Sequence, residues 1–319
     1  MLDLVSMGEA LIDFLTDRPG VTLTQARAFT WAPGGAPANV AVAAARLGLK
    51  TAFLGKVGRD PFGVYLRDCL ESNGVDVSQL QFSRRARTAL AFVALPTPDR
   101  PQFTFFRHPS ADMLLRPDEL NLEMLRSTQA FHFGSITLIS DPSRSATLEA
   151  AKAAREGGAL ISFDPNYRPA LWPPEVARKC ILSALSLCDL LKLNEEEVAM
   201  LTGTTDLVAG ARELLAKGPK VCLVTMGAEG SLFVTPRSDG HVPAPTVRTV
   251  DATGCGDAFT AAAIRGVLET GEVGSLGPLD LEEILRYANA VGALTATKKG
   301  GIPALPTSAQ VDAFLAEIA

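Results

Sequence analysis

Short apolar runs that alternate with helical stretches are the feature of this 319-residue chain that most constrains its fold. Strands buried on both faces and separated by helices are typical of a parallel α/β sheet with helices on both sides. Such sheets bind ligands at the carboxyl ends of their strands, so we expect a site there. The strand-like runs are 2–7, 51–57, 130–136, 159–164, 188–194 and 220–225, and the helical stretches are 36–47, 61–73, 141–156, 174–187 and 206–217.

Two segments interrupt this alternation. Residues 14–33 contain several threonines and lack a helical period, whereas residues 88–107 contain two β-like runs around a proline-rich stretch at 96–100. Two such runs predict a β-hairpin. We expect both segments to form a small β-sheet lid over the site within a single domain, 1–319. Alternatively, they are additional edge strands of the main sheet.

Composition narrows the possible partners. The formal net charge is −5, from 35 acidic and 30 basic residues, so we expect no nucleic-acid partner. No uncharged apolar run of 18 residues occurs, so we expect no membrane partner. Five cysteines without a CxxC pair, and a start without a basic signal region, favour a reduced, cytoplasmic protein.

The run 251–257 (DATGCGD) precedes an Ala-rich helix that extends to about Thr270. Gly254 and Gly256 remove side chains where the helix begins, which leaves backbone N–H groups open to an anionic phosphate. Asp257 then lies in the first turn, where a carboxylate can accept a proton from a hydroxyl group. Alternatively, Asp251 is only an N-cap and Asp257 only complements the helix dipole.

The wider pattern resembles the PfkB, or ribokinase-like, family of carbohydrate kinases. The run 251–259 (DATGCGDAF) is similar to its C-terminal signature, and 34–48 (GGAPANVAVAAARLG) is similar to its N-terminal signature. The spacing fits from residue 4 to about 307, including 55–63 (GKVGRDPFG). The resemblance implies a ribokinase-like three-layer α/β sandwich with a central, mostly parallel sheet and a β-sheet lid, and an ATP-dependent sugar kinase that uses Mg²⁺.

The resemblance also implies roles for individual residues. Asp257 is the base, Gly254, Cys255 and Gly256 form an anion hole, and Arg168 meets phosphates or an acidic substrate. The family usually has alanine where Cys255 stands. Because the backbone N–H does the work, we expect function to be retained, with an oxidisable thiol beside the site.

For ATP and Mg²⁺, the resemblance points to strand ends and loops, including an Asn-x-x-Glu motif. Each of these features also has an ordinary structural interpretation: a helix cap, a tight turn or a plain helical residue. The nucleotide-side residues are Lys192, Asn194, Glu197, Thr225, Gly227, Gly230, Gly254, Gly256 and Asn289.

At the sugar end, the family uses an aspartate after the first strand, the Gly-Gly signature and the lid. The two lid phenylalanines are alternatively a simple apolar lining. The sugar-side residues are Asp13, Gly34, Gly35, Asn39, Phe103, Phe105, Arg107 and Asp257.

A monovalent-cation loop for K⁺ is also implied, with mostly backbone ligands; alternatively, its lysine pair is only a surface feature. Its residues are Asp251, Thr253, Thr295, Lys298, Gly300 and Ala304.

Three stretches favour fructose as the substrate: 34–48, 106–115 (FRHPSADMLL) and 163–172 (FDPNYRPALW) resemble the forms found in bacterial fructokinases. Tyr167 instead resembles the form found in 2-keto-3-deoxygluconate kinases, which leaves that kinase, or another PfkB sugar or nucleoside kinase, as the alternative. A non-catalytic sugar sensor is the alternative of a different class. The absence of a Walker A sequence and of GxGxxG after the first strand disfavours P-loop kinases and dinucleotide-dependent oxidoreductases. A homodimer through the lid would hide the edges of its sheet.

Overall fold

A computed structural model describes residues 1–18, 20–97 and 100–318. Its main sheet has nine strands in the order β13-β12-β11-β10-β9-β8-β1-β4-β5. The pairs from β11 to β5 are parallel, whereas β12 and β13 add an antiparallel edge. The strands are β1 (Leu4–Gly8), β4 (Thr51–Gly58), β5 (Leu80–Ser83), β8 (Ala130–Gly134), β9 (Leu160–Asp164), β10 (Leu190–Asn194), β11 (Val221–Thr225), β12 (Ser231–Val234) and β13 (Asp239–Val242).

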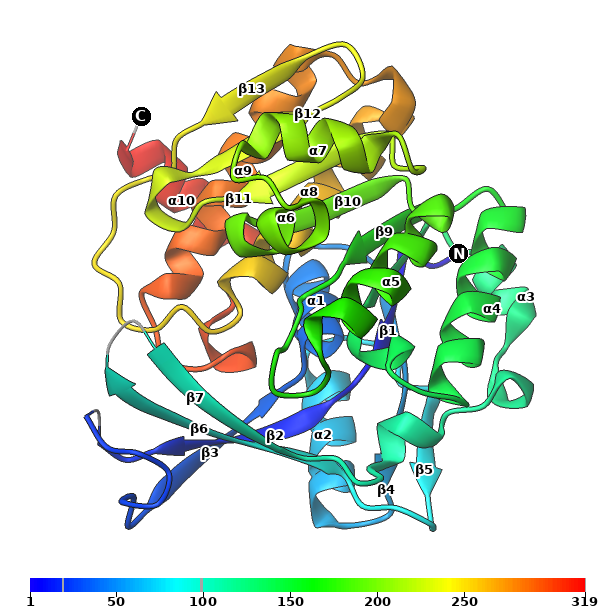
Figure 1. Ribbon diagram of the computed structural model, residues 1–319, viewed down its shortest axis with the longest axis vertical. Helices are drawn as coiled ribbons and strands as arrows, with labels where there is room; N and C mark the ends of the chain where they lie inside the picture. Colours follow the sequence, from blue (N-terminus) through cyan, green and yellow to red (C-terminus); the bar gives the residue numbers. More distant parts are fainter. Residues whose placement is uncertain (19, 98–99, 319) are drawn as a thin grey trace.

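Helices cover both faces of this sheet, which confirms the predicted three-layer α/β sandwich (Figure 1). Alternate residues of one strand enter two separate cores: Phe53 packs with α1, α8 and α9, whereas Leu54 packs on the side of α4 and α5. The helices are α1 (Ala36–Arg46), α2 (Pro61–Ser72), α3 (Leu122–Arg126), α4 (Ser143–Glu156), α5 (Pro174–Ala184), α6 (Glu195–Thr202), α7 (Leu207–Leu215), α8 (Cys255–Thr270), α9 (Pro278–Ala296) and α10 (Ser308–Ile318).

The apolar runs predicted the parallel strands well, because each of these strands is buried on both faces. All six predicted strands are present with ends shifted by two residues or fewer. The local chemistry also explains the helix starts: Asp60 caps α2 through a hydrogen bond from the Gly63 N–H, and Pro61 occupies the first turn. The edge strands β5, β12 and β13 were not predicted.

Four further strands form a separate small sheet, in the order β3-β2-β6-β7. This sheet extends from the lower left of the molecule in Figure 1, which confirms a lid rather than extra edge strands of the main sheet. Its strands are β2 (Leu11–Thr16), β3 (Phe29–Gly34), β6 (Ala89–Thr97) and β7 (Arg100–Phe106). Residue 19 of the first lid segment and residues 98–99 of the predicted turn lie outside the described residues.

The register of the lid gives it two different faces. Asp13 lies opposite Ala91, which lies opposite Phe105, so these three residues share one face. Phe14 lies opposite Trp31 and Phe92 on the other face. The polar group expected to meet the sugar and the exposed aromatic residues are therefore on opposite sides of the lid.

Within residues 1–18, 20–97 and 100–318, no helix has the length and apolar character needed to cross a membrane. A single domain spanning 1–319 stays a prediction.

Candidate active site

The amino end of α8 is built as an open anion-binding end. Gly254, the N-cap, has φ 81°, a left-handed conformation that glycine adopts without strain, and no side chain caps the helix. The Cys255 N–H donates to the carbonyl of Ala252 at 3.3 Å. The N–H of Gly256 has no acceptor among the described residues. The open amides, together with the helix dipole, favour a bound phosphate.

The positively charged side chain of Lys192 lies beside the amino end of α8. It lies near the end of β10 and is buried, and a Cβ atom added at Gly256 would lie 3.0 Å from its Nζ. Its Nζ pairs with Asp164 Oδ2, from the end of β9, at 3.0 Å. Burial alone lowers the pKa of Lys192, but Asp164 and Glu197 outweigh this effect and raise it. Lys192 is therefore a permanent charge beside the open helix end.

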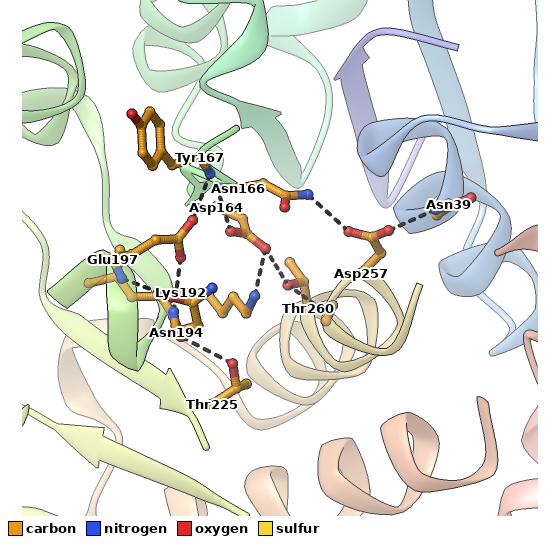
Figure 2. Close-up of polar contacts among 12 residues, drawn as sticks. Asn39, Asp164, Asn166, Tyr167, Lys192, Asn194, Glu197, Thr225, Asp257 and Thr260 are labelled. Atoms are coloured by element: carbon orange, nitrogen blue, oxygen red, sulfur yellow. Dashed lines mark hydrogen bonds and ion pairs between the residues drawn. The ribbon is translucent and has the colours of Figure 1, made fainter. Parts of the chain in front are cut away.

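Glu197 organises the adjoining strand ends. Its Oε2 accepts the Asn194 N–H at 2.9 Å, while Asn194 Oδ1 accepts the Glu197 N–H at 2.8 Å, which forms a capping box at the start of α6. Its Oε1 accepts the Tyr167 N–H at 2.7 Å, as Figure 2 shows. Burial raises the pKa of Glu197, and Asp164 raises it further.

These strand ends carry more negative than positive charge, which suits a hard cation. Asp164, Glu197 and Asp257 surround Lys192. Yet no group of three or more His, Cys, Asp or Glu residues able to hold a metal occurs in the described part of the chain. Mg²⁺ commonly uses one or two protein carboxylates together with water and substrate phosphates, so the residues fit that kind of site rather than a protein cage.

Asp257 is buried in the first turn of α8, and its carboxylate is held by two amides (Figure 2). Asn39 Nδ2 donates to Oδ2 at 2.7 Å, and Asn166 Nδ2 donates to Oδ1 at 3.4 Å. Burial raises the pKa of Asp257 to about 6; the Asn39 hydrogen bond opposes this shift, Asp164 adds to it, and Lys192 and Arg168 oppose it. A base with this pKa is ionised at neutral pH and is matched to proton acceptance.

Two of the predicted sugar-side residues lie near Asp257: Asn39 donates a hydrogen bond to it, and its charge acts on Asp13 of β2. Burial raises the pKa of Asp13 to about 7; Arg168 opposes the shift, and Asp257 adds to it. These effects place Asp13 and Arg168 within electrostatic range of Asp257. Phe105 shares the Asp13 face of the lid, and its ring stacks on that of Phe103 with centroids 5.9 Å apart.

The glycines of the N-terminal signature join the lid to α1. Gly34 ends β3 opposite Leu11, and Gly35 is the N-cap of α1. A residue that we did not predict, Glu9, holds this junction: its Oε1 accepts the Ala36 N–H at 3.1 Å. Burial raises the pKa of Glu9 to about 7.

Arg107 lies at the end of the lid, and a contact between its side chain and the sugar stays a prediction. It follows the last residue of β7, is buried, and pairs through its guanidinium with Asp112. Ser110 also donates a hydrogen bond to Asp112, at 2.5 Å. The charge of Arg107 is thus neutralised at the base of the lid, because a buried guanidinium needs a carboxylate partner.

Four of the predicted nucleotide-side residues lie at the end of β11, in the turn after it and on α9. Thr225 Oγ1 donates to the carbonyl of Leu193 at 3.2 Å, which ties the end of β11 to β10. Gly227 and Gly230 bound the short turn Gly227–Glu229 after that strand. Asn289 is buried on α9 and donates to the carbonyl of Val242 at 2.9 Å, so its amide N–H holds the end of β13. An adenine contact by Asn289 stays a prediction.

The predicted cation loop is closed by one carboxylate. Asp251 Oδ1 accepts the Thr253 N–H at 2.9 Å, and Asp251 Oδ2 accepts the Gly300 N–H at 2.8 Å. The hydroxyl of Thr295 donates to the Val291 carbonyl within α9. Lys298 follows α9, and Ala304 ends the short turn Ile302–Ala304. The structure therefore brings the two loops together, while a K⁺ ion in them stays a prediction.

Comparisons with known proteins decide the family. Residues 1–308 match the model of the pfkB family carbohydrate kinases. The chain belongs to this family. A probable fructokinase of Arabidopsis thaliana is 48% identical over 98% of this chain and 95% of its own, and a fructokinase of Solanum lycopersicum is 46% identical over 96% and 94%.

Solved structures of fructokinases are similar to this chain over nearly its whole length. A fructokinase of Xylella fastidiosa with bound ATP has a TM-score of 0.90 and 34% identity, over 100% of this chain and 99% of its own. A double mutant of the fructokinase from Vibrio cholerae, bound to fructose, ADP and a potassium ion, has a TM-score of 0.88 and 36% identity, over 98% and 97%.

Cys255 is a departure from the usual signature of this kinase family, and its surroundings make it a weak nucleophile. Burial, together with the negative charges of Asp251 and Asp257, raises the pKa of its thiol to about 12. The thiolate, not the thiol, is the readily oxidised form. The oxidation sensitivity that we predicted for this thiol is therefore not favoured by its environment.

Sequence reasoning missed Asp164 and Asn166 as members of this kinase site. Both belong to the run 163–172, from which only Arg168 was assigned a role at the site. The signal was available: Asp164 is a charged residue that ends a strand of apolar residues, at the sheet edge where ligands bind.

We expect Gly256→Ala to impair this kinase while preserving its fold. The new Cβ would lie 3.0 Å from the Lys192 Nζ, closer than an ordinary contact, so the amine would have to move away from the helix end where it pairs with Asp164. The value of kcat/KM for ATP should fall about tenfold or more. Gly274→Ala is the control, because its Cβ would meet the flexible Lys220 side chain at 3.4 Å, an ordinary contact. Unchanged ATP kinetics in Gly256→Ala would contradict a role for Lys192 at this position.

Proposed function

We propose that this chain catalyses ATP + D-fructose → ADP + fructose 6-phosphate. The observation that carries the proposal is the place of Asp257: it is buried in the first turn of an uncapped helix, between the Lys192 cluster and Asp13. One carboxylate can therefore meet both an incoming hydroxyl group and a transferring phosphoryl group. Fructose is favoured over other sugars because the curated relatives named above are fructokinases.

In the proposed reaction, the sugar lies between Asp13 and the inner face of the lid. Asp257 accepts the proton of the reacting hydroxyl group, whose oxygen attacks the γ-phosphorus of ATP. The open amides of α8 and the charges of Lys192 and Arg168 stabilise the negative charge on the transferring phosphoryl oxygens. Closure of the lid excludes water, which would otherwise accept the phosphoryl group.

Mg²⁺ is the metal that we propose for this reaction, and K⁺ is a possible activator. Asn194 and Glu197 would orient Mg²⁺ and its water near the phosphates, where the ion would neutralise their charge. The 251–253 and 298–301 loops, joined by Asp251, would hold K⁺ through backbone carbonyls. The cytoplasmic location expected from the sequence remains a prediction.

Asp257→Asn tests the base. The amide preserves the shape of the side chain but cannot accept the proton, so kcat should fall by about 10²–10⁴. In the parent enzyme, Asp257 loses its basic form as pH falls through its pKa of about 6, so kcat/KM should decline below that pH and level off above it. A coupled assay of ADP release measures both. Near-normal turnover by Asp257→Asn would remove this residue from the base role.

The sugar is tested by ADP release with fructose, 2-keto-3-deoxygluconate, ribose and adenosine, each with and without K⁺. We expect the highest kcat/KM with fructose and stimulation by K⁺. Arg168 is the specific feature that keeps 2-keto-3-deoxygluconate as the second candidate, since its guanidinium lies within electrostatic range of Asp13 and Asp257 and suits a carboxylate. Turnover with the acid sugar alone would replace fructose by this substrate.

We also propose a homodimer through the outer face of the lid. Trp31 and Phe106 are 46% and 59% exposed there, and they contact an aromatic cluster that includes Phe92 and Tyr65. A patch of this kind on a soluble protein commonly marks an interface. Sedimentation equilibrium should give a dimer for the parent chain and a monomer for Trp31→Glu/Phe106→Glu. Val176→Glu, on the exposed surface of α5, is the control, and a monomeric parent chain would refute the dimer.

A further inference from the structure

Asn166 has an unusual backbone for its residue type. Its φ is +46°, and it is the one non-glycine residue with positive φ among the described residues. Asparagine tolerates this left-handed conformation better than most residues, yet it still carries a cost that the surroundings must offset. Strain of this kind collects at functional sites, so the contacts that maintain it are informative.

Two carboxylates on the nucleotide side hold this backbone. The Asn166 N–H donates to Asp164 Oδ1 at 3.1 Å, and the next N–H, that of Tyr167, donates to Glu197 Oε1 at 2.7 Å. Asp164 is itself fixed by Lys192. The conformation of Asn166 is therefore set by the charged groups at the ends of β9 and β10.

The side chain of Asn166 points the other way, toward the proposed base (Figure 2). Its Nδ2 donates to Asp257 Oδ1 at 3.4 Å, while Asn39 takes the other oxygen. Asn166 thus donates one N–H to each of two buried carboxylates that repel each other, its backbone N–H to Asp164 and its side-chain N–H to Asp257.

We propose that Asn166 is a positioning residue, which holds the Asp257 carboxylate in the orientation that accepts the proton of the sugar hydroxyl. An asparagine fits this role better than glycine or aspartate, because it combines an amide donor with tolerance of the left-handed backbone. Glycine keeps the backbone and loses the donor; aspartate keeps the shape and adds a third negative charge. The inference rests on the proposed role of Asp257 as the base.

A donor to a carboxylate favours its charged form, so loss of the Asn166 amide should make Asp257 easier to protonate. The other groups that act on Asp257 are Asp164, Lys192 and Arg168, with Asp13 and Cys255 also in range. None of these changes in the Asn166 variants. The acid side of the kcat/KM profile should therefore move to higher pH.

The experiment measures kcat and kcat/KM with fructose and ATP from pH 5 to 9 for the parent, Asn166→Gly and Asn166→Asp. For Asn166→Gly, we expect kcat to fall about tenfold or more, because a hydrogen bond to a charged group is lost, and the acid side of the profile to move up in pH. For Asn166→Asp, both effects should be larger. Asn121→Asp, at the surface N-cap of α3, makes the same chemical change elsewhere and should behave as the parent.

Two outcomes would overturn the inference. The first is parental kinetics in both Asn166 variants. The second is a fall in kcat by the same factor at every pH with an unshifted acid side, which is the mark of a merely structural residue. Asp257→Asn, measured in parallel, distinguishes failure of this inference from failure of the proposed function. If Asp257→Asn is inactive, only the role of Asn166 has failed. Near-normal turnover by Asp257→Asn would instead refute both the base role of Asp257 and this inference.

Discussion

The meeting of one buried lysine with three carboxylates at the open end of α8 is the interaction on which the rest of the site depends. Lys192 pairs with Asp164 and lies beside Gly256, and Glu197 and Asp257 are close enough to raise its pKa. Burying so many charges is unfavourable unless each has a partner. Here the buried carboxylates are partnered by backbone amides, by a capping box and by Lys192. The negative charge that remains suits a cation, and the open amides of α8 suit a phosphate.

The two faces of the lid sheet carry different residues. The inner face carries Asp13 and Phe105, and the outer face carries Trp31 and other aromatic residues. The two-residue period of a strand makes this division possible in a sheet only one layer thick. The buried Arg107–Asp112 pair at the end of β7, with Glu9 holding the start of α1, gives the lid a fixed base on the main domain.

Two residues that were predicted to bind ligands also support the scaffold. Asn39 was expected to bind sugar, and its amide N–H donates to Asp257. Its Oδ1 is buried without a partner among the described residues and remains able to accept a hydrogen bond from a sugar hydroxyl. Asn289 was expected to meet adenine, and its amide N–H supports the end of β13. A side chain with two functional ends can serve the scaffold with one and a ligand with the other, and sequence motifs do not separate these uses.

The sequence by itself determined the parallel sheet, the lid and the place of Asp257, because strands buried on both faces, and glycines at a helix start followed by a carboxylate in the first turn, are local patterns with strong physical consequences. Only the tertiary structure decided which charges meet. Asp164, Lys192 and Asp257 are separated by many residues in the sequence, and the pairing of the buried Arg107 with Asp112 was not predicted. Ion pairs and shared hydrogen bonds depend on distances of a few ångströms across elements, and no local pattern encodes them.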